Sequence, residues 1–201
     1  MILTEKHEMM RKFFRQFAET EFTPELLDEL DETGEFNWEI FNKIAAAGLT
    51  GCKIPVEYGG QGGDTLAYCI MIEELARRSV VLSIYANTSN SLGGGPLYQF
   101  GNEAQKQKYL VPCAKGEKII VFALTEPGAG SDVQGAQTVA VQEGDEWVIT
   151  GSKIFTTNSG FADTCLLFAL TDRTVPAAKG LTAFIVDLKE MPGISVSENI
   201  E

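Results

Sequence analysis

Apolar residues recur at intervals of three and four along the first half of the chain, the spacing of amphipathic helices. Thr4, Thr23, Asn37, Asp64 and Asn102 each precede such a stretch, and their side chains can cap a helix N-terminus. We therefore predict helices that begin near residues 5, 24, 38, 65, 80 and 103, with a short one ending near residue 101. On the first and third of these, the faces expected in the core carry Met10, Phe13, Phe14 and Phe17, and Trp38, Phe41 and Ile44.

The pattern changes near residue 117, where short β-rich runs begin to alternate with turn residues. Because the runs are too close together for crossover helices, the pattern favours a mainly antiparallel sheet. The predicted fold class is α + β, with an all-helical domain over residues 1–116 and a mainly antiparallel, β-barrel-like domain over residues 117–201. The predicted strands cover residues 119–125, 137–142, 146–150, 153–157, 164–171 and 181–187.

Two features stand out within the helical half. Residues 54–64, IPVEYGGQGGD, form a glycine-rich loop that ends at the helix-capping Asp64. The helix expected over residues 80–92 has an unusually small and polar composition, so it is either closely packed or lines a cavity. The tripeptide at residues 93–95 is all glycine and precedes Pro96, which predicts a break after that helix.

The charge balance narrows the function classes. Sixteen basic and 28 acidic residues give a net charge of −12, which argues against a general nucleic-acid binder and against docking on anionic membranes. Hydrophobic residues make up 44% of the chain, as in globular proteins. No secretory signal and no apolar run of about 20 residues is visible, so we expect a cytoplasmic protein without a membrane partner.

Cysteine and histidine spacing excludes further chemistries. The four cysteines form no C-x-x-C pair, so we expect no metal site and interpret them as buried, reduced thiols. His7 is the one histidine in the sequence, which argues against a zincin helix and a Ser-His-Asp hydrolase, and we expect it at the surface. The glycine clusters fit neither the G-x-G-x-x-G pattern of dinucleotide folds nor a P-loop.

Two segments carry the candidate chemistry. FALTEPGAGSD, residues 122–132, begins as a strand and breaks at Pro127 into a glycine-rich loop whose backbone amides could approach a ligand. A second polar cluster, residues 156–160, follows Phe155 at the end of another expected strand. Together the two strand ends could form a wall for a planar heterocycle, although from chemistry alone an ordinary wide connection between strands is the preferred interpretation of the first segment.

Several motifs together resemble the amino-terminal helical domain and the middle β domain of the acyl-CoA dehydrogenase family. The matching stretches appear in family order and extend over nearly the whole chain, and TEPGAGSD is the most specific of them. They are PVEYGGQGGD (55–64), YQFGNEAQKQKYL (98–110), FALTEPGAGSD (122–132), GSKIFTTNSG (151–160) and LTAFIVD (181–187).

The resemblance implies an FAD enzyme that desaturates acyl-CoA thioesters between the α and β carbons, with hydride transfer to flavin N5. It implies that backbone near Thr125 and the Thr125 hydroxyl bind the flavin pyrimidine edge, that Ser131 contacts both FAD and the CoA part of the substrate, and that Thr157 lies near N5. Phe155 stands where the family usually has Trp stacked on the flavin. The expected cofactor-binding residues are Phe122, Ala123, Leu124, Thr125, Gly130, Ser131, Phe155, Thr156 and Thr157, and Ser131 is also the expected substrate-binding residue.

No catalytic residue is assigned. The resemblance implies that the base is a glutamate in a second helical domain, so we expect this chain to be a fragment, and we interpret Glu126 and Asp132 as turn or capping residues. The implied partners are an acyl-CoA substrate, an electron-transferring flavoprotein as electron acceptor and further copies in a homotetramer. Two alternatives stay open: a flavin monooxygenase or nitroalkane oxidase on the same scaffold, and a non-catalytic acyl-CoA or flavoprotein-binding module.

Overall fold

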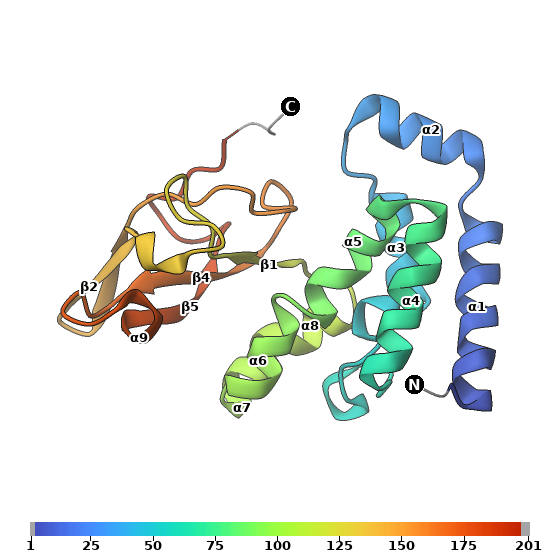
Figure 1. Cartoon of the computed structure of the whole chain (residues 1–201), viewed down its shortest axis with the longest axis horizontal. Coiled ribbons are helices and arrows are strands. Elements are labelled where there is room, and N and C mark those ends of the chain that lie inside the picture. The colour runs from blue at the N-terminus through green and yellow to red at the C-terminus, as the bar shows by residue number, and fades with distance from the viewer. Residues whose placement is uncertain (1–2, 198–201) are drawn as a thin grey trace. The chain divides into compact units, whose positions relative to one another are not determined.

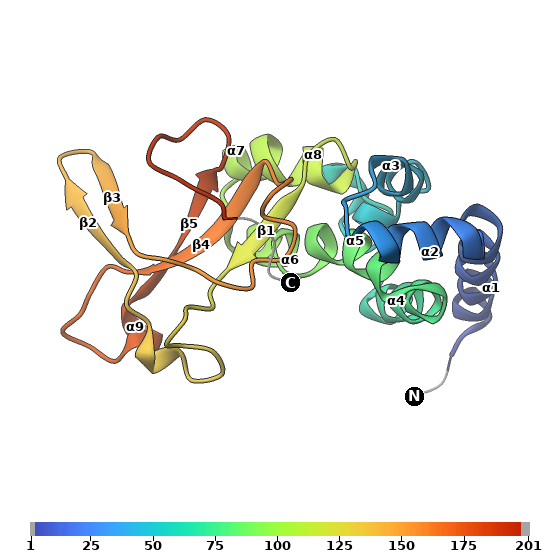
Figure 2. The ribbon, with the colours of Figure 1, turned by 90° about the horizontal axis from the view of Figure 1, so that it is seen from above.

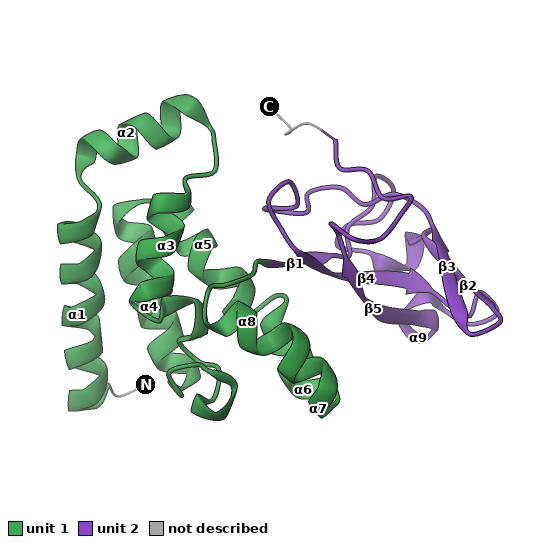
Figure 3. Ribbon diagram, turned by 180° about the vertical axis from the view of Figure 1, so that it is seen from behind, with its two compact units in different colours: residues 1–119 green, residues 120–201 purple. Residues whose placement is uncertain are grey.

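The computed structural model describes residues 3–197. The chain divides into two compact units, residues 1–119 and residues 120–201 (Figure 3). The first is helical and the second contains the sheet, in agreement with the predicted α + β class. Each unit is described by itself.

The helical unit is built around α1, α3, α4 and α5, with α1 beside α4 and α2 running across one end (Figures 1 and 2). The predicted capping residues all cap helices, because each side-chain oxygen accepts a backbone N–H of the first turn. The helices are α1 (Glu5–Glu21), α2 (Pro24–Thr33), α3 (Trp38–Ala46), α4 (Thr65–Arg78), α5 (Val80–Asn90), α6 (Gly94–Phe100), α7 (Glu103–Gln105) and α8 (Val111–Ala114), with 3₁₀ turns η1 (Leu49–Gly51) and η2 (Val56–Tyr58) and a π-helical segment η3 (Lys106–Leu110).

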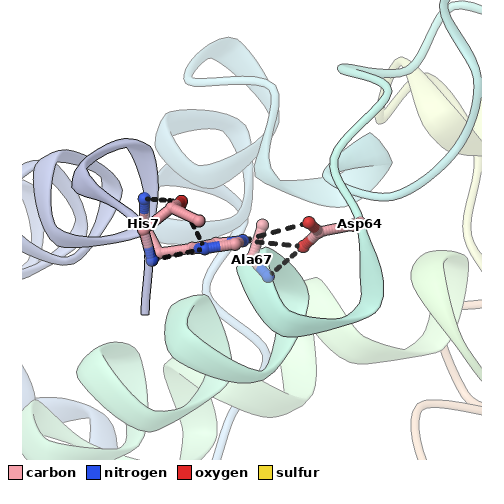
Figure 4. A network of polar contacts seen from close by, with 4 residues as sticks. His7, Asp64 and Ala67 are labelled. Atoms are coloured by element: carbon pink, nitrogen blue, oxygen red, sulfur yellow. Dashed lines mark hydrogen bonds and ion pairs between the residues drawn. The ribbon is translucent and has the colours of Figure 1, made fainter. Parts of the chain in front are cut away.

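His7 is buried, which corrects its expected surface position. Its Nε2 lies 3.0 Å from an Asp64 carboxylate oxygen, and Asp64 also accepts the Ala67 amide as the cap of α4 (Figure 4). On the other side of the ring, Nδ1 accepts the Thr4 amide, so Nε2 carries the proton that is donated to Asp64. His7 therefore joins the N-terminus of α1 to that of α4.

The aromatic stripes were predicted only in part. Phe14, Phe41 and Ile44 are buried, but Phe13 is 52% exposed and Trp38 is 48% exposed. These two rings lie at the margins of their helix faces, where they pack against neighbouring aromatic rings instead of entering the core.

The polar helix α5 is closely packed, which is the first of the two alternatives predicted for it. Asn90 is fully buried, and its amide group donates to the carbonyls of Leu49 and Ala86, each at 2.7 Å. Its carbonyl oxygen accepts the Lys53 amide at 3.0 Å. The chain does break after α5, but the break ends before Pro96. Helix α6 begins at Gly94 and includes Pro96, since a proline is tolerated in the first helical turn.

The second unit contains one mixed sheet, with β4 at its centre. The strands are β1 (Ile120–Ala123), β2 (Val139–Glu143), β3 (Glu146–Thr150), β4 (Thr164–Leu170) and β5 (Leu181–Asp187). Along one edge β4 pairs in parallel with β1 and then, at Leu170, with β2; along the other it pairs antiparallel with β5. The β2–β3 hairpin is antiparallel.

The prediction of a mainly antiparallel sheet is confirmed, because the two antiparallel pairings, β2–β3 and β4–β5, are longer than the two parallel ones. One detail is corrected: the sheet is not a closed barrel. The chain between β1 and β4 contains the β2–β3 hairpin, so this length of chain allows a parallel return without a crossover helix. The short helices of this unit are η4 (Val133–Gly135), a 3₁₀ turn, and α9 (Ala177–Gly180).

Residues 153–157 do not form the predicted strand. Phe155 has φ 57° and Asn158 has φ 66°, both in the left-handed region, which is incompatible with a continuous extended strand. The Lys153 side chain is buried against Glu126. Contacts with the loop that follows β1 therefore override the local preference of residues 153–157 for a strand.

Two further expectations concern burial and membrane segments. Cys52, Cys113 and Cys165 are buried, as expected, but Cys69 is exposed on α4, which corrects that expectation. None of the four, all within the described residues, forms a disulfide. Among residues 3–197, no helix combines the length and apolarity needed to cross a bilayer.

Candidate functional site

The first candidate segment leaves the sheet at the end of β1. Phe122 lies on β1 with its ring 4.9 Å from that of Phe168, Ala123 is buried, and Leu124 and Thr125 continue beyond the strand. Thr125 is half-buried, and its carbonyl accepts the Ile154 amide at 2.9 Å. Within the described chain, no hydrogen bond engages the Thr125 amide or hydroxyl. Both groups therefore remain available as donors.

A glycine-rich loop follows. Glu126 and Ala129 exchange two backbone hydrogen bonds, of 2.9 and 3.0 Å, which closes a tight turn over Pro127 and Gly128. Gly130 and Ser131 come next and are exposed, and the space beside the Gly130 Cα is open. Asp132 then caps η4 by accepting the Gln134 amide, which agrees with its interpretation as a capping residue.

The second candidate segment exposes an aromatic ring on an unusual backbone. Phe155 is 70% exposed, and its φ of 57° is costly for a bulky residue. The Thr157 amide donates back to the Phe155 carbonyl at 3.1 Å, and the Thr156 carbonyl accepts the Ser159 amide. Thr157 is exposed and Thr156 half-buried. Such strain at an exposed ring is typical of functional sites.

Glu126 connects the ends of the glycine-rich loop. Its side chain is 5% exposed, and its carboxylate accepts the amides of Gln137 at 2.6 Å and Thr138 at 3.1 Å. Burial raises the pKa of this carboxyl group, but the hydrogen bonds from Lys153, Gln137 and Thr138 outweigh burial and lower the pKa to about 2. Glu126 is thus an ionised structural group, as its interpretation as a turn residue requires.

Lys153 joins the two segments, and reasoning from the sequence missed it. Its side chain is 8% exposed, and its ammonium donates to Glu126 Oε1 at 2.6 Å and to the Leu124 carbonyl at 3.2 Å. With the bond from Ile154 to Thr125, these contacts bring residues 124–126 and 153–154 together. Among the described residues, no hydrogen bond links Gly130 or Ser131 to residues 155–157. The available signal was a lysine at the start of an expected strand, directly before the apolar Ile154 and Phe155.

The helical unit contains a separate hollow of about 300 Å³. Small side chains and backbone make up most of its lining, which includes Ala45–Gly48, Gly59 and Ala114. None of the predicted site residues lines it, and it offers little for acid–base chemistry, so we do not assign it the chemistry. Across residues 3–197 no group of histidine, cysteine or carboxylate side chains could hold a metal ion.

The two segments suit a flat heteroaromatic ligand with hydrogen-bond acceptors along one edge. Thr125 offers an amide and a hydroxyl, Ser131 and Thr157 offer exposed hydroxyls, and Phe155 offers a ring face. An isoalloxazine ring has this character, so the donor set fits the FAD implied by the resemblance. The Glu126 carboxylate is buried, paired with Lys153 and bonded to two backbone amides, so it is not available as a base. The Asp132 carboxylate serves as a cap by accepting the Gln134 amide.

The chain matches two models of one family. The acyl-CoA dehydrogenase N-terminal domain matches residues 4–117, and the acyl-CoA dehydrogenase middle domain matches residues 121–201. Two curated relatives extend this result. Subunit CarC of the caffeyl-CoA reductase–Etf complex of Acetobacterium woodii is 48% identical over 99% of this chain and 52% of its own length. The short-chain specific acyl-CoA dehydrogenase of Clostridium acetobutylicum is 47% identical over 98% of this chain and 51% of its own length.

Solved structures give the same result. The acyl-CoA dehydrogenase of Bacillus anthracis, solved in complex with FAD, superposes with a TM-score of 0.85 at 35% identity, covering 99% of this chain and 33% of that one. The present chain spans about half the length of the curated relatives it matches. The chain belongs to the acyl-CoA dehydrogenase family.

Proposed function

We propose that this chain provides the helical and β parts of an FAD-dependent acyl-CoA dehydrogenase. The observation that carries the proposal is the pair of loops at the end of β1 and at residues 153–157, which present unengaged donors and an exposed ring while buried contacts hold them together. When bound, FAD would supply the acceptor for the hydride that leaves the β carbon of the acyl thioester.

The residues have distinct proposed roles. The backbone of Phe122–Thr125 and the Thr125 hydroxyl hold the pyrimidine edge of the flavin, and Gly130 lets the backbone approach it. The Phe155 ring stacks on the flavin face, and Thr157, beside Thr156, donates near N5. Ser131 binds FAD and the CoA part of the substrate. Since Glu126 is paired with Lys153 and Asp132 serves as a helix cap, we propose that the base that removes the α proton comes from outside these loops.

Two relatives bear on the direction of the reaction and on the electron partner. The Clostridium acetobutylicum relative is named a dehydrogenase, and the Acetobacterium woodii relative is a subunit of a caffeyl-CoA reductase–Etf complex. The two names describe opposite directions of the redox reaction. We propose an acyl-CoA or enoyl-CoA substrate and an electron-transferring flavoprotein as the redox partner. We further propose that the whole protein is a cytoplasmic homotetramer. The boundary between its helical and β domains lies between residues 116 and 117.

FAD titration of the purified chain tests the proposal. We expect quenching of flavin fluorescence and a shift of its visible absorption as FAD binds. Thr125→Val and Ser131→Ala should each weaken binding by about tenfold or less, the worth of one hydrogen bond. Ser159→Ala, in the same segment as Thr157, serves as the control because Ser159 has no proposed ligand role. Absence of FAD binding at any accessible concentration would refute the proposal.

A further inference from the structure

The Lys153 ammonium reaches a peptide group of the candidate flavin site. The carbonyl of Leu124, which accepts from Lys153 Nζ at 3.2 Å, belongs to the same peptide unit as the Thr125 amide. A cation bound to a carbonyl draws charge from it and makes the N–H of that peptide a stronger donor. The Thr125 amide therefore carries the effect of Lys153 to whatever it binds.

Glu126 fixes Lys153 in this position. The 2.6 Å contact between Lys153 Nζ and Glu126 Oε1 compensates a charge whose side chain is only 8% exposed. The ends of the glycine-rich loop are held without Lys153, because the Gln137 and Thr138 amides already bind Glu126. The Lys153 ammonium is therefore not needed to close the glycine-rich loop. Its second contact, with the Leu124 carbonyl, acts on the peptide that carries the Thr125 amide.

We propose that Lys153 is a positioning residue of the flavin site, which fixes and polarises the Leu124–Thr125 peptide so that the Thr125 amide is aimed at the flavin and donates strongly to it. This inference rests on the proposed function, since it takes Thr125 as a flavin ligand. Without Lys153 the peptide loses one of the contacts that fix it, and the Thr125 amide becomes an ordinary donor.

The test compares Lys153→Met with a matched control in the same unit. Met keeps an unbranched, flexible side chain one atom shorter than that of Lys and removes the charge. Lys189 also forms a lysine–carboxylate pair, 2.7 Å from Asp163, but its side chain is 60% exposed, so Lys189→Met removes a pair at the surface. A double variant, Lys153→Met with Glu126→Gln, removes both buried charges and separates lost stability from lost positioning.

Three measurements are made on each variant: urea unfolding, FAD titration, and the reduction potential of the bound flavin. We expect Lys153→Met and the double variant to bind FAD more weakly, by up to about tenfold, and to shift its potential. Lys189→Met should match the wild type. The double variant should recover stability relative to Lys153→Met but not affinity.

A fourth measurement needs no cofactor. The amide proton of Thr125, followed by nuclear magnetic resonance in the protein without FAD, should move upfield in Lys153→Met and stay unchanged in Lys189→Met. Folded Lys153 variants with wild-type FAD affinity, potential and Thr125 resonance would overturn the inference, and so would loss of folding in both. If the wild type binds no FAD while the Thr125 resonance still responds to Lys153, the proposed function fails but the effect of Lys153 on the peptide stands.

Discussion

Phe155 combines exposure with an unfavourable backbone conformation. A residue with a large side chain at φ 57° costs about 1–2 kcal/mol relative to its ordinary conformations. Its ring is 70% exposed, so packing within the described chain recovers little of that cost. The position is therefore better explained by a ligand than by the fold.

Replacing this residue separates binding from stability. We expect Phe155→Gly to leave the unfolding free energy unchanged or raise it by up to about 1 kcal/mol, because glycine adopts positive φ freely. The same change should weaken FAD binding by up to about tenfold through the lost stacking. FAD titration and urea unfolding measure the two effects, with Phe100→Gly on α6, 84% exposed, as the control for loss of an exposed ring. Undiminished affinity for FAD would contradict the stacking role.

Glu126 makes the stability of the protein depend on pH. Its pKa of about 2 lies below the ordinary value of 4.5, so its stabilising effect is complete above about pH 4.5 and disappears as the pH falls through about 2. We expect Glu126→Gln to cost about 2 kcal/mol at pH 7. Urea unfolding from pH 7 to pH 3 should show this difference shrinking below pH 4.5. A difference that is independent of pH would mean that the carboxylate charge does not contribute.

At the scale of the elements, His7 attaches α1 to α4, although no pattern in the sequence indicated this role. His7 lies three residues after the cap Thr4, where a capping box usually has Glu or Gln, and its second nitrogen reaches the cap of α4. The carboxyl group it meets has its pKa lowered by the Ala67 amide first and by His7 second. One imidazole thus serves two helix N-termini.

Removing the imidazole should loosen α1. We expect His7→Ala to lower the unfolding free energy by about 1–2 kcal/mol, from the lost capping and hydrogen bonds. His7→Gln should recover part of this loss by restoring the usual capping box. Thermal unfolding checks both variants, with exposed Lys12→Ala on the same helix as the control. Equal stability of His7→Ala and Lys12→Ala would show that the network contributes nothing.

The helices were predictable because their signals are local. Each cap lies next to the turn that it closes, so Thr4 and Asp64 could be assigned from neighbouring residues alone. The bond from Lys153 to Leu124 and the irregular backbone at Phe155 depend on residues far apart in sequence, so no periodicity reports them. The sequence did single out both candidate segments, whereas the roles of their residues in binding flavin stay predictions.

For the molecule as a whole, we expect flavin binding without turnover from these 201 residues. Glu126 is buried and paired with Lys153, and Asp132 serves as a helix cap, so we expect no dehydrogenation of butyryl-CoA with a dye acceptor. An intact short-chain acyl-CoA dehydrogenase assayed in parallel is the control. Turnover of about 1–10³ s⁻¹, the ordinary range for enzymes, would show that this chain already contains the base.

The parallel pairing of β1 with β4 has a consequence for the order of folding. The β2–β3 hairpin and the β4–β5 pair join segments close in sequence, whereas Ile120 must find Thr164 across a long intervening chain. Pairings between distant segments form more slowly, so β1 should be the last strand to dock. Because Leu124 and Glu126 directly follow β1, the junction with Lys153 is complete only after that step. A cofactor that needs this junction would therefore bind only molecules that have finished folding.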